Sequence, residues 1–241
     1  MDLEERAGAV AGWLLAPLTG TLSLLRRARM FHPEGAVYRG RVEILPGPYP
    51  VLARRLEGPA LARLSTAWWR GGKEWLDALG IGLRFGKDPG AQAHAGDQDL
   101  LFATIRYPWT TPFAPFTTEQ HDFLANDYYA VSPFDVAGVG RAKLRLVSSR
   151  PRKLSAAKRG DRLAEAVARG EAFLRLELRT EKRWEPVARI VLLEPSQVDQ
   201  ARLRFSPFRD GKGISPRGFV HGLRRATYLI SQLARPARSS A

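Results

Sequence analysis

Four segments with the residue pattern of β-strands constrain the fold most strongly. They cover residues 36–45, 142–150, 172–180 and 186–194, and their apolar residues either alternate with polar ones or run continuously. Alternation with a period of two places the apolar side chains on one face of a sheet. Helical patterns seldom separate these strands, whereas a parallel sheet needs a crossover helix between neighbouring strands. The sequence therefore predicts an α+β fold, in which helices surround an antiparallel sheet or barrel.

Other segments complete the predicted framework. Residues 81–86 and 99–107 have strand patterns, and residues 161–170 have the pattern of a short helix that ends at Gly170. We also expect an aromatic-rich helix within residues 60–80, a helix with a threonine cap at 117–131, and a final helix at 219–236.

The charge of the chain limits the classes of partner. The 38 basic residues exceed the 24 acidic ones, which gives a net charge of +14. Nucleic acid, an anionic membrane surface or an anionic ligand would suit such a charge, and so would a surface that is merely solvated. Because no nucleic-acid-binding motif occurs, the sequence predicts no nucleic-acid partner.

The first 28 residues form a separate N-terminal unit in this interpretation. They read as a helical arm that Pro17 and Gly20 interrupt, and they begin with acidic residues, unlike a secretory signal. An arm that packs on the domain is the favoured interpretation. The alternative is a peripheral membrane contact through residues 1–27, with Trp13, Leu14 and Leu15 inserted. We expect a cytoplasmic protein, with membrane association as the alternative.

Several kinds of active site are excluded. The chain has no cysteine, and His32, His94, His121 and His221 lack the spacing of metal ligands. It also has no phosphate-binding loop and no nucleophile elbow.

The predicted C-terminal helix contains one pair of chemical interest. Arg224 and Tyr228 lie four residues apart and so share a helix face. A guanidinium near a phenol favours the phenolate, which is an axial haem ligand in some proteins. Taken alone, the pair is more typical of an ordinary helix surface, because such pairs are common.

Four motifs occur in a fixed order along the chain. They are RMFHPEGAVYRGRVE at 29–43, RLST at 63–66, DALGIGLRF at 77–85 and GISPRGFVHGLRRATY at 213–228. In this order and spacing they resemble the haem catalase superfamily, over residues of about 26–108 and again about 184–235. The resemblance implies an antiparallel β-barrel of the catalase core type in a minimal version, spanning residues 29–241, with haem b as the cofactor.

The resemblance also implies roles for individual residues. His32 resembles the acid–base histidine, Ser65 the hydroxyl that orients it, and Tyr228 the ligand of the ferric iron. Arg224 resembles the cation that keeps this tyrosine ionised.

A second group of residues resembles the groups that hold the haem propionates. These are Arg29, Arg63 and Arg235, with Thr66 adding a hydrogen bond. Buried propionates need such cations, since an unpaired buried charge is costly.

The chain departs from the catalase pattern on the distal side. Ala103 stands where the family has an asparagine, Thr104 follows it as the remaining polar candidate, and Phe31 precedes the histidine in place of a small residue. In these departures the chain resembles small catalase-related peroxidases and enzymes that convert lipid hydroperoxides.

The leading hypothesis is a haem enzyme acting on organic or lipid hydroperoxides. The alternatives are a weak hydrogen peroxide catalase and a non-enzymatic haem-binding or sensing protein. A homodimer is the expected oligomer if the chain associates with itself.

Overall fold

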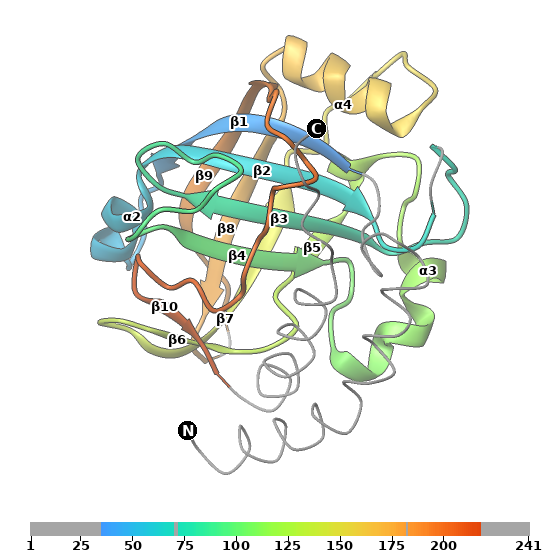
Figure 1. Cartoon of the computed structure of the whole chain (residues 1–241). Helices are drawn as coiled ribbons and strands as arrows, with labels where there is room; N and C mark the ends of the chain where they lie inside the picture. Colours follow the sequence, from blue (N-terminus) through green and yellow to red (C-terminus); the bar gives the residue numbers. More distant parts are fainter. Residues whose placement is uncertain (1–34, 70–71, 182, 218–241) are drawn as a thin grey trace.

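The computed structural model describes residues 35–69, 72–181 and 183–217 (Figure 1). The strands form one sheet, and short helices surround it. In chain order the elements are β1 (Gly35–Ile44), α2 (Pro50–Leu56), β2 (Gly58–Thr66), β3 (Leu79–Phe85), β4 (Gln98–Ala103), η1 (Pro108–Phe113), α3 (Ala114–Thr117), η2 (Phe123–Ala125), β5 (Asp127–Tyr129), β6 (Phe134–Val136), β7 (Gly140–Ser148), α4 (Arg159–Ala168), β8 (Phe173–Arg179), β9 (Glu185–Pro195) and β10 (Ile214–Pro216).

The sheet closes on itself as an eight-stranded barrel. The strand order is β7-β5-β4-β3-β2-β1-β9-β8, and pairing of β8 with β7 completes the circle. Strands β6 and β10 extend the sheet from β7. Every pairing among the described strands is antiparallel. The predicted fold class is therefore confirmed.

The barrel interior holds the main hydrophobic core. Leu64, Ile81, Leu100, Leu146 and Leu176 are all at most 1% exposed and come from five different strands. Their neighbours in sequence point outward because side chains alternate along a strand. This alternation confirms the strands predicted at 36–45, 142–150, 172–180 and 186–194, which are β1, β7, β8 and β9.

The prediction of a short helix at 161–170 is also confirmed. Helix α4 has a strongly apolar face, on which Leu163 and Ala166 are fully buried. It ends before Gly170, whose φ of +69° lies in the left-handed region that glycine adopts without strain.

Two other predicted helices are wrong. Residues 117–131 contain only the end of α3, the three-residue η2 and strand β5. Side chains compete for the backbone there: the Asp122 carboxylate accepts from Leu124 N, and the Asn126 amide donates to Glu119 O.

Within residues 60–80, β2 and β3 replace the aromatic-rich helix. The Asp77 carboxylate accepts bonds from the backbone of residues 67–69 and stabilises the loop between them.

A carboxylate on α4 makes stability depend on pH. Glu165 accepts bonds from Ser155 N and Ala156 N, and these bonds lower its pKa to about 2. The stabilisation is complete above the normal pKa of 4.5 and is lost as pH falls from there toward 2. We expect Glu165→Gln to lower stability at neutral pH and to flatten the decline in this window, as measured by urea unfolding at several pH values. A Glu171→Gln control should follow the wild-type curve.

Residues 1–28, the predicted arm, and the predicted helix at 219–236 lie outside the described residues. No helix in the described ranges is long and apolar enough to cross a membrane.

Candidate functional site

A row of small residues crosses the outer face of four neighbouring strands. Gly35 of β1 pairs with Ser65 of β2, Ser65 with Gly80 of β3, and Gly80 with Ala103 of β4. Residues directly opposite one another in an antiparallel pair lie on the same face. The flanking residues Leu64 and Phe102 point into the core, so this row faces outward. We call these four residues the small-residue strip.

A second row beside the strip combines an arginine with apolar residues. Val37, Arg63, Gly82 and Leu101 pair in register across the same strands. The ring of Phe205 covers Gly82, where an added Cβ would lie 3.0 Å from the ring. Arg63 is 5% exposed, and its guanidinium carbon lies 3.0 Å from the position of a Cβ on Gly35. Its charged group therefore lies next to the strip.

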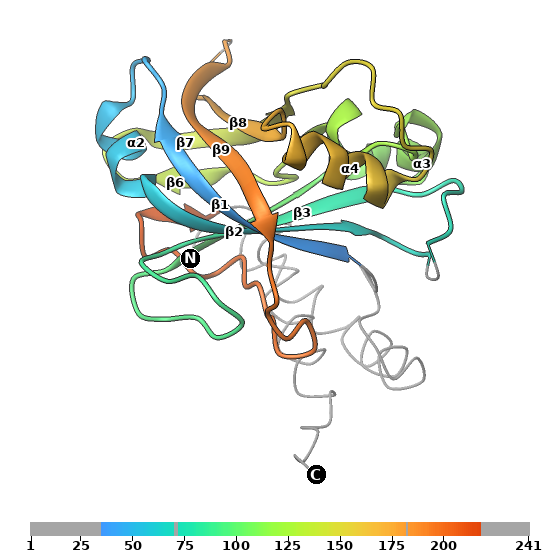
Figure 2. The ribbon, with the colours of Figure 1, turned by 90° about the horizontal axis from the view of Figure 1, so that it is seen from above.

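A buried ion pair lies further along the same two strands, β3 and β4. Arg84 of β3 and Asp99 of β4 form two hydrogen bonds, of 2.8 and 3.0 Å, and both side chains are fully buried. The Asp99 carboxylate also accepts from Ser206 N at 2.9 Å and pairs with Arg209. Because Ser206 and Arg209 follow β9, the pair fixes this returning segment on the barrel, where Figure 2 shows it crossing the outer face.

The neighbouring Gln98 anchors the same segment further along. Its amide nitrogen donates to Arg209 O at 2.8 Å and Ile214 O at 3.0 Å, and its oxygen accepts from Ile214 N at 3.2 Å. The amide is completely buried. The segment that leads to the predicted C-terminal helix is thus held by buried polar groups of β3 and β4.

The predicted site residues separate into two groups within the structure. Arg63 and Ser65 lie together on the outer face, and the Ser65 hydroxyl donates to Gly80 O at 3.3 Å. Thr66 lies on the opposite side of β2, where its hydroxyl donates to Trp69 O. The Thr104 hydroxyl accepts from Leu79 N at 3.1 Å and lies 2.8 Å from the Thr118 hydroxyl. The structure therefore does not bring Thr66 or Thr104 to the strip.

The other predicted site residues lie outside the described ranges. They are Arg29, His32, Arg224, Tyr228 and Arg235, and their roles stay predictions. Within the described ranges, no cluster of three or more histidine and acidic side chains could hold a metal ion.

The strip and Arg63 allow a test of whether the described residues suit haem. A flat macrocycle needs a surface without large projecting side chains, and its propionates need a cation nearby. The strip carries no side chain larger than that of serine, and Arg63 supplies a buried guanidinium beside it. These residues fit the group.

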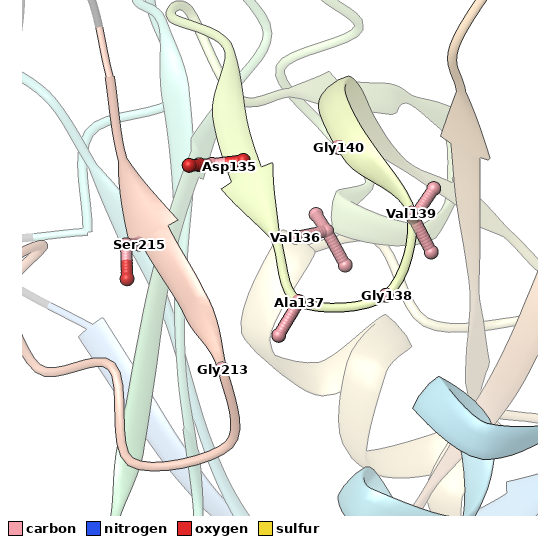
Figure 3. Close-up of a pocket in the computed structure, with 8 residues that line it drawn as sticks. All are labelled: Asp135, Val136, Ala137, Gly138, Val139, Gly140, Gly213 and Ser215. Atoms are coloured by element: carbon pink, nitrogen blue, oxygen red, sulfur yellow. The ribbon is translucent and has the colours of Figure 1, made fainter.

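A hollow elsewhere on the barrel is a weaker candidate. Figure 3 shows it between the turn that joins β6 to β7, residues 135–140, and the start of β10. Asp135 is the one ionisable residue in its lining, and its carboxylate pairs with Arg217 at 3.2 Å. Figures 1 and 2 place β6 and β10 at the end of the barrel away from α3. Apart from Asp135 and the Ser215 hydroxyl, the lining carries only glycine, alanine and valine.

Sequence reasoning missed Arg84, Asp99 and Gln98 as site-shaping residues. Arg84 belongs to the third of the four motifs, and Asp99 begins the segment compared with the distal asparagine region. An arginine and an aspartate in two adjacent apolar strands were the available signal, since buried charges occur in pairs.

Comparison with known proteins concerns the fold. No protein-family model and no curated protein match the chain. Among solved structures, a fungal catalase superimposes with a TM-score of 0.58 at 15% sequence identity. The match covers 90% of this chain and 62% of the catalase, so the chain spans less than two thirds of that protein. The protein therefore has a catalase-like fold, as its motifs predicted.

Proposed function

We propose that this protein is a haem-dependent enzyme that consumes organic or lipid hydroperoxides. The observation that carries the proposal is the small-residue strip with Ser65 in it and Arg63 beside it, on a barrel of catalase-like fold. When bound, haem supplies the redox chemistry that breaks the O–O bond.

The residues of the chain would bind the cofactor and move the proton. Arg63, with Arg29 and Arg235, would neutralise the propionates, and Tyr228 would be the iron ligand, kept ionised by Arg224. His32 would take a proton from one peroxide oxygen as a neutral imidazole and return it to the other oxygen as an imidazolium, since imidazole exchanges protons near pH 7. Ser65 would orient that imidazole.

The proposed substrate class rests on Ala103. It lies on the strip, and a methyl group cannot donate the hydrogen bond that an asparagine would give to a small peroxide. A substrate bound through its apolar body depends less on such a donor. We therefore favour organic or lipid hydroperoxides over hydrogen peroxide as the substrate.

The absorption spectrum of protein loaded with haem b tests the proposal. The wild type should give a high-spin ferric spectrum typical of tyrosinate ligation, which Tyr228→Phe should abolish. Tyr49→Phe, at the α2 end of the barrel, is the matched control and should leave the spectrum unchanged. A spectrum insensitive to Tyr228→Phe, or no haem binding at all, would contradict the proposal.

A rate comparison then separates the activities. We expect turnover of an organic hydroperoxide with little oxygen release from hydrogen peroxide. Rapid oxygen release would instead identify a catalase, and haem binding without turnover a haem-binding protein.

A further inference from the structure

The segment 108–117 exposes its largest side chains. Trp109, Phe113 and Phe116 are 71%, 64% and 71% exposed, whereas Ala114 and Pro115 of the same segment are buried. Ala114 packs against Ala67 and Ala78 at the ends of β2 and β3. Large aromatic residues usually take the buried positions, so this inverted arrangement indicates a surface that contacts something apolar.

The β2–β3 loop extends this apolar surface. Trp75 is 62% exposed, and its ring lies 5.4 Å from that of Trp69. The packing of Ala67 and Ala78 on Ala114 places this loop beside α3, and Figure 1 shows both beyond the same ends of the strands. Two loops thus present aromatic rings at one end of the barrel.

Uncompensated cations border the aromatic rings. Trp109 stacks on Tyr107 at 4.8 Å, and Arg106 and Lys143 lie 5.5 and 5.6 Å from the Tyr107 ring. Arg179 is the cross-strand neighbour of Lys143. None of these three cations forms an ion pair with a carboxylate among the described residues. The surface therefore complements a partner that is both apolar and anionic.

We propose that this end of the barrel docks on an anionic membrane surface. Trp109, Phe113 and Phe116 enter the boundary between headgroups and acyl chains, where aromatic side chains are favoured. Arg106, Lys143 and Arg179 contact the anionic headgroups. A nucleic acid would use aromatic rings for base stacking, but Tyr107 is already stacked by Trp109. The proposal does not depend on haem binding or on the proposed substrate.

Co-sedimentation of full-length protein with vesicles tests the proposal. The vesicles are pure phosphatidylcholine, or contain about one third phosphatidylglycerol as the anionic lipid. We expect binding to the anionic vesicles that weakens with added salt. One variant combines Trp109→Ser, Phe113→Ser and Phe116→Ser. A second combines Arg106→Gln, Lys143→Gln and Arg179→Gln. Each cation near such a surface contributes about fivefold to binding, so the second variant should bind at least about tenfold more weakly. The first variant loses the apolar area of three aromatic rings and should also bind at least about tenfold more weakly.

Matched controls separate this surface from the rest of the chain. Ile44→Ser with Val51→Ser removes exposed apolar residues at the α2 end, and Arg39→Gln, Arg54→Gln and Lys87→Gln remove three exposed cations elsewhere. Both controls should bind like the wild type, and circular dichroism should show that all variants are folded.

Three outcomes would overturn the proposal. The first is no binding of the wild type to anionic vesicles, and the second is undiminished binding of both test variants. The third comes from a parallel assay with single-stranded oligothymidine: a cation variant that loses binding to this oligonucleotide but not to vesicles. The second would assign membrane contact to another part of the chain, and the third would identify a nucleic-acid surface.

Discussion

Replacing Arg84 with methionine is expected to lower the free energy of unfolding by about 3–5 kcal/mol, the largest stability effect of any substitution considered. The reason is the fully buried Asp99 carboxylate, which would lose its two hydrogen bonds to Arg84. Arg84 also donates to Gly90 O at 2.7 Å and to Arg204 O. The change therefore loosens both the strand pair and the segment that follows β9.

Urea unfolding measures this effect, with an exposed arginine as the control. Arg41 pairs with Glu43 at 3.0 Å but its side chain is 62% exposed, so Arg41→Met should cost less than about 1 kcal/mol. The double variant Arg84→Met, Asp99→Asn also removes the buried carboxylate charge, while the amide oxygen of the new side chain still accepts from Ser206 N. Its cost should fall short of the sum of the single costs by ~1 kcal/mol or more. Additive costs would show that the pair is not coupled.

Replacing Ala103 with phenylalanine is expected to weaken haem binding by about tenfold or more, because a large ring would occupy the flat strip. Ala103 lies opposite Gly80 and in line with Ser65, so its side chain sets the height of that surface. This expectation rests on the proposed function. Titration of apoprotein with haem, followed by absorbance, measures the dissociation constant.

Two further variants make that result interpretable. Val191→Phe places the same ring on a half-buried position of β9, outside the strip, and should leave haem affinity within about twofold of the wild type. Ala103→Gly keeps the strip flat and should bind haem normally. If Ala103→Phe bound haem as tightly as Val191→Phe, the strip would not be the haem surface.

The barrel was predictable because its strands follow the simplest pattern. Alternating residues in β1, β7 and β8 specify half-buried strands directly, and the absence of crossover helices indicates antiparallel pairing. The helix predicted at 117–131 failed because capping patterns cannot distinguish a helix start from a turn that Asp122 and Asn126 stabilise through side-chain bonds.

The candidate site was harder to predict, because it depends on register. Gly35, Ser65, Gly80 and Ala103 are scattered over about 70 positions of sequence, and they form a row only once the pairing of four strands is known. The face of β2 on which Thr66 lies was predictable, however. Consecutive residues of a strand face opposite ways, so Ser65 and Thr66 cannot both face the same ligand.

Closure of the barrel has a consequence for synthesis of the chain. One edge of β1 pairs with β2, the next strand of the chain, but the other edge pairs with β9, as in the match of Arg41 with Val191. While the ribosome adds the intervening residues, the backbone of β1 presents unpaired donors and acceptors along that edge. Such an edge can pair with another nascent chain, and non-local pairings form slowly. We therefore expect the yield of folded protein to depend on chaperones and on the rate of translation until β9 has emerged.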